Sequence, residues 1–202
     1  MSKIGILGGT FNPIHNGHIT LAKAAKNQLL LDKVLIMPTG VSYLKASQSV
    51  QPKEVRAEMV RLAVRDESGL EFSDIEVNRE GNTYTYETLL SLKATNPNDD
   101  LYFLIGADTL FSIENWKEPQ IIFDNCIIAV MVRDNANLDD LNAKIKQLVI
   151  KYNTKCEIIT ADRIDISSTY IREQIHLGNS AGIKDLLPEA VYEYIVNESI
   201  YL

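Results

Sequence analysis

Two histidines that follow a pair of glycines are the residues of this chain best suited to phosphate chemistry. His15 and His18 lie in the stretch Gly8-Gly9-Thr10-Phe11-Asn12-Pro13-Ile14-His15-Asn16-Gly17-His18, between a predicted strand and a predicted helix. Adjacent glycines let the backbone approach a ligand, and a helix N-terminus presents free N–H groups at the positive end of its dipole. The pattern therefore predicts a phosphate site that both imidazoles face. The alternative is that His15 caps the loop and His18 caps the helix.

A second cluster of polar residues precedes a predicted C-terminal helix. Ser167, Ser168 and Thr169 are followed by Arg172, one turn into that helix. Serine and threonine at such a place are ordinary helix caps when they stand alone. Together with a guanidinium and free N–H groups they would form a second clamp for phosphate oxygens. Since no P-loop lysine and no serine or cysteine nucleophile motif is present, the residues favour phosphoryl transfer by positioning and charge neutralisation.

Both stretches resemble one enzyme superfamily. The first is similar to the His-x-Gly-His signature of the nucleotidylyltransferases, and GGTFNPIHNGH resembles the bacterial nicotinate mononucleotide adenylyltransferase family in particular. The stretch Ile166–Arg172 resembles the Ile-Ser-Ser-Thr-x-Ile-Arg motif of the same superfamily. Two motifs in the right order are more specific than either one. The resemblance runs from Lys3 to the helix after Pro188. It implies adenylyl transfer from ATP to nicotinate mononucleotide, with Mg²⁺ accompanying the triphosphate.

The resemblance also implies which residues bind the two substrates. It gives catalytic roles to His15, His18 and Arg172, and no resident metal site in the protein. The residues implied in ATP binding are Gly8, Gly9, Thr10, Phe11, His18, Ile105, Gly106, Asp108, Ser167, Ser168, Thr169 and Arg172. Those implied in mononucleotide binding are Thr10, His15, Lys45, Tyr84, Thr85, Trp116 and Arg133.

Three shorter stretches add to the resemblance. Ile105–Asp108 resembles the family element that holds the adenosine, although by itself it also fits a plain strand-to-helix turn. Asn82–Leu89 resembles the family's x-Ser-Tyr-Thr-x-x-Thr-Leu, and Thr85 suits a helix N-cap. Trp116 matches a tryptophan that stacks on the pyridine ring in this family, whereas composition alone favours a core position.

One loop departs from the family pattern. Where the family usually carries Pro-Pro-His-Lys, this chain has Ser42-Tyr43-Leu44-Lys45. Lys45 is retained as a cation for phosphate or as a solvated lysine, but Leu44 replaces the histidine, which weakens the expected hold on the mononucleotide. Arg133 matches a family arginine after a strand, where it contacts phosphate or forms a salt bridge.

Strands alternate with helices along the chain. The predicted strands are Ile4–Leu7, Lys33–Met37, Leu70–Val77, Leu101–Ile105, Cys126–Val132 and Glu157–Thr160. Helices are predicted between them, followed by C-terminal helices at Ser168–Leu177 and Pro188–Glu198. This order predicts an α/β fold with a doubly wound, Rossmann-like parallel sheet in one domain over residues 1–202. The loops after the first, second and fourth strands should then converge on one crevice.

Composition excludes several other classes of protein. The formal net charge of −7 argues against a nucleic-acid partner. Cys126 and Cys156 lack the spacing of a zinc site, and no apolar segment is long enough for a signal peptide or a membrane span. We therefore expect a cytoplasmic protein, and the sequence leaves a homo-oligomer open. The rivals are a nucleotidyltransferase for pantetheine phosphate or glycerol phosphate and a non-catalytic nucleotide-binding protein.

Overall fold

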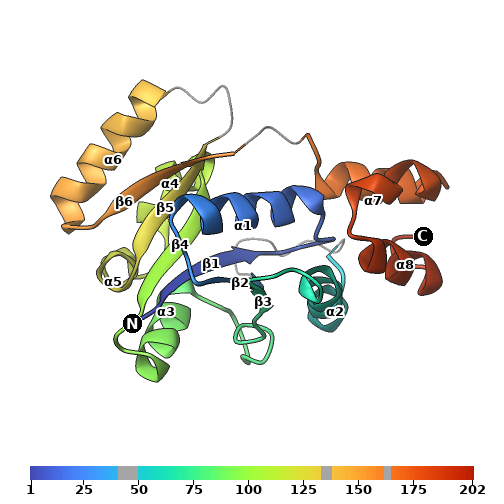
Figure 1. The fold of residues 1–202 in the computed structure, drawn as a ribbon, viewed down its shortest axis with the longest axis horizontal. Coiled ribbons are helices and arrows are strands. Elements are labelled where there is room, and N and C mark those ends of the chain that lie inside the picture. Colours follow the sequence, from blue (N-terminus) through green and yellow to red (C-terminus); the bar gives the residue numbers. More distant parts are fainter. Residues whose placement is uncertain (41–49, 133–137, 162–164) are drawn as a thin grey trace.

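A six-stranded sheet with helices on both faces forms the body of the molecule, which we describe from a computed structural model for residues 1–40, 50–132, 138–161 and 165–202 (Figure 1). The strands are β1 (Lys3–Gly9), β2 (Lys33–Pro38), β3 (Leu70–Phe72), β4 (Asp100–Gly106), β5 (Ile127–Val132) and β6 (Cys156–Thr160). Their order across the sheet is β3-β2-β1-β4-β5-β6, and every neighbouring pair is parallel. The predicted doubly wound α/β fold is confirmed.

Apolar side chains on both faces of the strands build two cores. In β1, Leu7 belongs to one core, whereas Ile4 and Ile6 belong to the other. Helices α1 (Asn16–Gln28) and α2 (Lys53–Val64) supply the first core. Helices α3 (Thr85–Thr95), α4 (Ala107–Ser112), α5 (Pro119–Asn125) and α6 (Leu138–Tyr152) supply the second. Strands buried on both faces read as near-continuous apolar runs, which is why the sequence revealed them.

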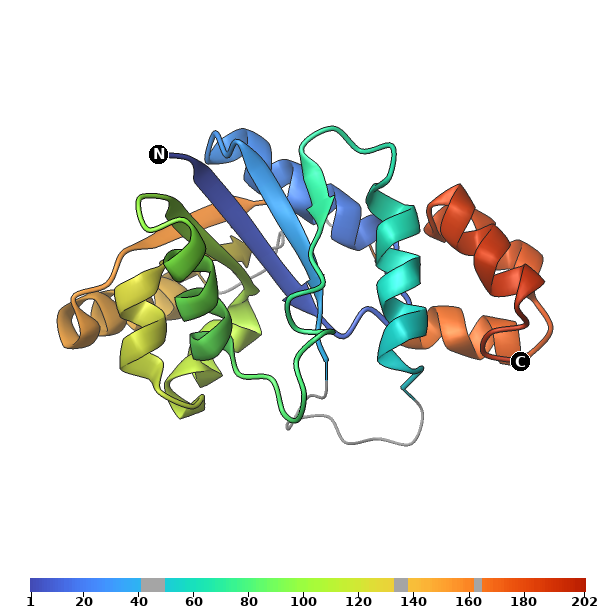
Figure 2. The same cartoon turned by 90° about the horizontal axis from the view of Figure 1, so that it is seen from below.

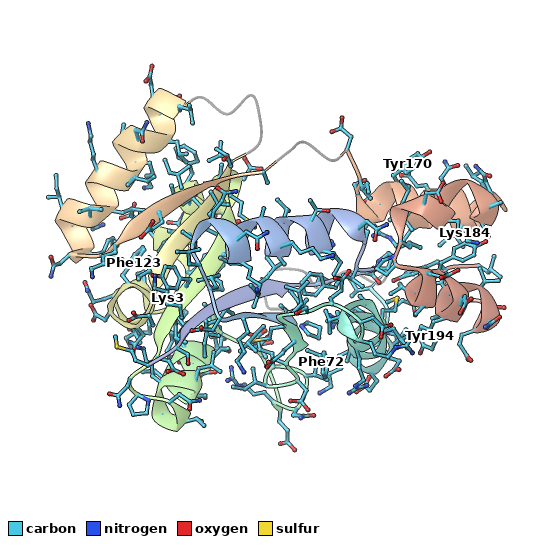
Figure 3. The ribbon with its side chains drawn as sticks, in the orientation of Figure 1. Lys3, Phe72, Phe123, Tyr170, Lys184 and Tyr194 are labelled. Atoms are coloured by element: carbon cyan, nitrogen blue, oxygen red, sulfur yellow. The ribbon has the colours of Figure 1, made fainter. Side chains whose placement is uncertain are left out.

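The last helices lie together at one end of the molecule. They are α7 (Ser168–His176), the 3₁₀ segment η2 (Ser180–Leu186) and α8 (Glu189–Asn197), and α8 packs beside α2 (Figure 2). Figure 3 places Tyr170 and Tyr194 on these helices, at the opposite end from Phe123 of α5. Ile171 and Ile195 extend the first core outward. This packing brings the start of α7 to the loop after β1.

The strand order sets the position of the binding crevice. The chain runs from β1 to one side of the sheet and from β4 to the other, so the topology reverses between these two neighbours. Ligands of such sheets bind beyond the carboxyl ends of the strands at this reversal. The loop after β1 and the start of α4 lie there, and the short 3₁₀ segment η1 (Ile113–Asn115) follows α4.

Two local predictions are wrong. The alternating stretch Leu70–Val77 is a strand only as far as Phe72, because the chain then turns, with the Asn78 N–H donating to Asp74 O at 2.9 Å. Thr85 is the first residue of α3 and not its N-cap, a position that Tyr84 occupies without a side-chain bond. The segment η2 was not predicted. Among the described residues, no helix is long and apolar enough to cross a bilayer.

Candidate active site

The two histidines of the loop after β1 lie face to face at the start of α1. His15 is the N-cap residue, and its N–H donates to Nδ1 of His18 at 3.2 Å. Their rings are stacked, with centroids 3.7 Å apart and an interplanar angle of 29°. Because Nδ1 of neutral His18 is an acceptor, its proton lies on Nε2, which can donate to a ligand. The capping role of the histidines is therefore present, and on His18 it engages Nδ1 rather than Nε2.

The glycines of the loop serve different purposes. A Cβ on Gly17 would lie 3.0 Å from Nδ1 of His15, and one on Gly9 would lie 2.9 Å from the ring of Phe11. These two glycines make room for the loop's own side chains, so the lack of a Cβ at Gly9 is explained by Phe11 rather than by a ligand. A Cβ on Gly8 would meet only Phe103 at 4.0 Å, and one on Gly106 would meet nothing within 4 Å. Space for a ligand is therefore found at Gly8 and Gly106.

The second polar cluster is attached directly to this loop. Nη1 of Arg172 donates to the main-chain oxygen of Asn12 at 2.8 Å, and Nη2 donates to Oγ1 of Thr169 at 3.2 Å. Oγ of Ser168 donates to Pro13 O at 2.8 Å, whereas Ser167 is the true cap and accepts the Tyr170 N–H at 3.1 Å. The structure thus brings the two sequence motifs together, and Arg172 keeps further N–H donors.

A cavity opens beside the loop at the carboxyl ends of β1 and β4. Its empty volume, with the part open to solvent, is about 950 Å³. Four of the residues predicted to bind the mononucleotide line it together, namely Thr10, Tyr84, Thr85 and Trp116. The other lining residues are Ile6, Gly8, Gly9, Met37, Thr39, Glu76, Thr83, Thr88, Leu89, Phe103 and Lys117.

Aromatic side chains and one lysine border this cavity. Trp116 is partly exposed and meets Phe103 edge to face, with ring centroids 6.1 Å apart. Nζ of Lys117 lies 4.3 Å from the centroid of the Tyr84 ring. Trp116 therefore packs against the second core and also forms a wall of the cavity. Lys117 was not predicted as a site residue from the sequence, although it directly follows Trp116, which was predicted.

A buried carboxyl group stands in the same wall. Oε1 of Glu76 accepts a bond from the Thr88 hydroxyl at 2.9 Å, and that hydroxyl accepts from Nη1 of Arg79 at 3.1 Å. Burial raises the pKa of Glu76, while the Thr88 bond and the charge of Arg79 lower it in part. This chain of bonds joins the turn after β3 to the first turn of α3. No sequence motif pointed to it.

The remaining predicted residues divide into two groups. Ile105 is buried in β4, and Asp108 is an exposed residue of the first turn of α4. Lys45, with the neighbouring Leu44, and Arg133 lie outside the described residues. No group of three or more potential metal-ligating side chains occurs within the part of the chain that the structure describes.

Comparison with known proteins agrees with this geometry. The pattern of the cytidylyltransferase-like family matches residues 6–174. A curated relative from Lachnoclostridium phytofermentans, named probable nicotinate-nucleotide adenylyltransferase, is 40% identical over 202 residues and all of both chains. One of the same name from Clostridium tetani is 38% identical over 201 residues, again over all of both chains. The chain belongs to the cytidylyltransferase-like family, and within it to the nicotinate-nucleotide adenylyltransferases.

Solved structures give the same fold. A Plasmodium falciparum nicotinic acid mononucleotide adenylyltransferase complexed with NaAD superposes with a TM-score of 0.80 at 20% identity, over 100% of this chain and 98% of that one. A Vibrio parahaemolyticus structure, described as a putative nicotinate-nucleotide adenylyltransferase, gives 0.69 at 22% identity, over 100% and 96% of the two chains.

Proposed function

We propose that this protein transfers the adenylyl group of ATP to nicotinate mononucleotide, in the cytoplasm, as a step of NAD biosynthesis. The observation that carries the proposal is the direct attachment of the two phosphate motifs, through the Arg172–Asn12 bond, beside a cavity walled by Trp116 and Tyr84. The names of the full-length relatives at 38–40% identity support it. The two free cysteines, Cys126 and Cys156, suit a reducing compartment.

The reaction needs positioning and charge neutralisation more than covalent catalysis. An oxygen of the mononucleotide phosphate attacks the α-phosphorus of ATP, and the bond from that phosphorus to the bridging oxygen breaks, which releases pyrophosphate. Nε2–H of His18, the N-terminus of α1 and the spare donors of Arg172 would stabilise the charge on the α-phosphate. His15 would orient His18 through the stacked rings and would face the mononucleotide.

The cavity beside the loop would hold the pyridine ring. Trp116 would stack on the ring, and the N-terminus of α3 at Thr85 would receive its carboxylate. Glu87 lies in the same first turn, and its side chain is bonded to the Tyr86 hydroxyl at 2.9 Å. Gly8 and Gly106 would leave room for ATP, because a Cβ at either position would meet little.

Mg²⁺ would enter with ATP rather than reside in the protein. The described residues place the exposed carboxylate of Asp108 at the carboxyl end of β4, where it could share such an ion with the phosphates. Mg²⁺ in nucleotide sites is bound by phosphates, waters and one or two carboxylates. When bound, such an ion would supply positive charge to the pyrophosphate group. We propose Asp108 as the side chain that faces this metal and the ATP ribose.

A pyrophosphate-release assay with a panel of acceptors tests the proposal. ATP and Mg²⁺ are supplied with nicotinate mononucleotide, nicotinamide mononucleotide, pantetheine phosphate or glycerol phosphate. Pyrophosphate should appear fastest with nicotinate mononucleotide, together with an equal amount of the deamido dinucleotide. Faster turnover of another acceptor would reassign the substrate, and no turnover of any acceptor would favour a nucleotide-binding protein without catalysis.

A further inference from the structure

One buried arginine outside both motifs bonds to the loop after β1. We call this loop, residues 10–15, the phosphate loop. Arg56 of α2 is only 3% exposed, yet its guanidinium donates to four main-chain oxygens. These are Thr10 O at 2.7 Å, Thr39 O at 2.7 Å, Gly40 O at 3.1 Å and Gln51 O at 3.0 Å. The arginine therefore joins the loop after β1, the residues that follow β2 and Gln51, which lies two residues before α2.

Helix stability does not account for an arginine at this place. Its helical neighbours on the buried face are apolar, Met59, Val60 and Ala63, and Arg56 forms no ion pair within the described residues. Burial lowers the pKa of Arg56, which reflects the cost of removing the charge from water. Such a cost is tolerated where a buried charge fixes one particular arrangement of the chain.

The arrangement fixed here includes a peptide group of the phosphate loop. Thr10 and Phe11 are joined by a trans peptide bond, in which C=O and N–H point in opposite directions. Because the guanidinium holds the Thr10 carbonyl, the N–H of Phe11 must point away from Arg56. That N–H has no hydrogen-bond partner among the described residues. Phe11 also adopts the left-handed φ of 47°, which is strained for a bulky residue and needs support from its surroundings.

The neighbouring residue Asn12 is held by a second set of bonds. Its Oδ1 accepts the Gln51 N–H at 3.1 Å and the Tyr201 hydroxyl at 2.8 Å. Gln51 is thereby fixed at both ends of its backbone, since its own carbonyl accepts from Arg56. The loop has little freedom to turn its peptide groups while these bonds are intact.

We propose that Arg56 is a positioning residue, which keeps the N–H of Phe11 turned toward a nucleotide phosphate without touching the substrate itself. The inference rests on the proposed function, because it supposes that a phosphate of ATP binds at this loop. The ring of Phe11 lies edge-on to that of His18, with centroids 5.0 Å apart. We infer that one phosphate meets both the Phe11 N–H and the His18 donor.

The test compares Arg56→Ala and Arg56→Lys with a control at the other end of α2, Arg65→Ala. Arg65 is exposed and pairs only with the adjacent Asp66 in the described structure. For a folded Arg56→Ala we expect kcat to fall about tenfold or more, as for loss of an aligned oxyanion donor. Methylguanidinium should restore part of this loss, whereas methylammonium should not. If Arg56→Ala fails to fold, Arg56→Lys decides, because one ammonium cannot reach four carbonyls.

A second readout follows the Phe11 amide itself by NMR. Adding ATP and Mg²⁺ should move the Phe11 amide proton downfield in the wild type and in Arg65→Ala, and much less in Arg56→Lys. Wild-type kcat in a folded Arg56 variant, absence of rescue by methylguanidinium in a folded Arg56→Ala, or an unmoved Phe11 amide in the wild type would each overturn the inference. If the amide moves with ATP but no acceptor is turned over, the proposed function fails and the positioning role stands.

Discussion

The main-chain N–H of His15 donates to Nδ1 of His18, and this 3.2 Å bond fixes which nitrogen of His18 carries its proton. A neutral imidazole whose Nδ1 accepts must donate from Nε2. The backbone at the start of α1 thus prepares His18 as a hydrogen-bond donor before any substrate arrives. Such preorganisation is what makes a donor effective in stabilising developing charge.

Removing this donor should abolish most of the activity. We expect His18→Ala to fold but to lose at least about a hundredfold in kcat, since one aligned oxyanion donor is worth roughly 3 kcal/mol. His18→Asn can keep the bond to the His15 N–H through its side-chain oxygen, yet it lacks a donor at the position of Nε2. It should therefore be nearly as slow.

Exposed His176 in α7 gives the control, and His176→Ala should keep full turnover. Steady-state kinetics and circular dichroism on the three variants suffice. Near-normal turnover of a folded His18→Ala would remove His18 from the catalytic set.

Gly17 should be needed for catalysis rather than for folding. A Cβ in Gly17→Ala would lie 3.0 Å from Nδ1 of His15 and would push the imidazole off its stack with His18. We expect kcat to fall about tenfold, the size of a misplacement effect on a positioned group, while the melting temperature changes little. Asn27→Ala, at an exposed site of α1, is the control. If Gly17→Ala and Asn27→Ala had equal kcat, displacement of the His15 imidazole would not matter for catalysis.

The sequence revealed the motif residues of the site but not the residues that hold them. Paired histidines and a Ser-Ser-Thr cap have distinctive spacing, so they can be found without a structure. Arg56 has no motif, although a charged residue on the apolar face of α2 was a usable signal. Glu76 was hidden because the alternating stretch around it looks like a strand, while Ser73 and Asp74 end β3 early. Strand order could not be predicted, because it depends on contacts between residues far apart in sequence.

Lys117 should favour the acid over the amide form of the mononucleotide. Its ammonium group lies at the rim of the ring cavity, over Tyr84, where a substrate carboxylate would approach. We expect Lys117→Gln to lower kcat/KM for nicotinate mononucleotide about two- to fivefold, because an ion pair open to solvent contributes little. The kcat/KM for nicotinamide mononucleotide should not change. The effect should shrink at high salt. Lys155→Gln, at an exposed site, is the control. An equal loss for both substrates would assign Lys117 to general binding.

Lowering the pH should weaken the bonds between Glu114 of η1 and the side chains of α6. Glu114 accepts bonds from Lys144, from Lys151 at 2.8 Å and from the Tyr152 hydroxyl at 3.1 Å. The Lys144 and Lys151 bonds lower the pKa of Glu114 from its ordinary value of 4.5 to about 2. A depressed pKa gives stability that is fully present above the unfolded-state value and is lost as the pH falls through the folded-state value.

Glu114→Gln should therefore be less stable than the wild type at pH 7, by about 1–2 kcal/mol once solvent screening of the partly exposed pair is allowed for. The difference should narrow steadily below pH 4.5. Urea denaturation between neutral and acidic pH measures it, with exposed Glu157→Gln as the control. A difference that stays constant with pH would mean that the ion pairs contribute nothing and that the substituted side chain merely packs badly.

Adenylyl transfer to the acid mononucleotide can be tested by direct competition between the two mononucleotides. ATP and Mg²⁺ are given with equal amounts of nicotinate and nicotinamide mononucleotides, and both dinucleotides are measured by mass spectrometry as initial rates. A carboxylate can accept two main-chain N–H bonds at the start of α3, whereas an amide turns its own NH₂ toward those donors, a mismatch worth about 1.5–3 kcal/mol. We predict that the deamido dinucleotide forms at least about tenfold faster than the amide dinucleotide, with one pyrophosphate per product. Equal or faster formation of the amide dinucleotide, or no dinucleotide at all, would contradict it.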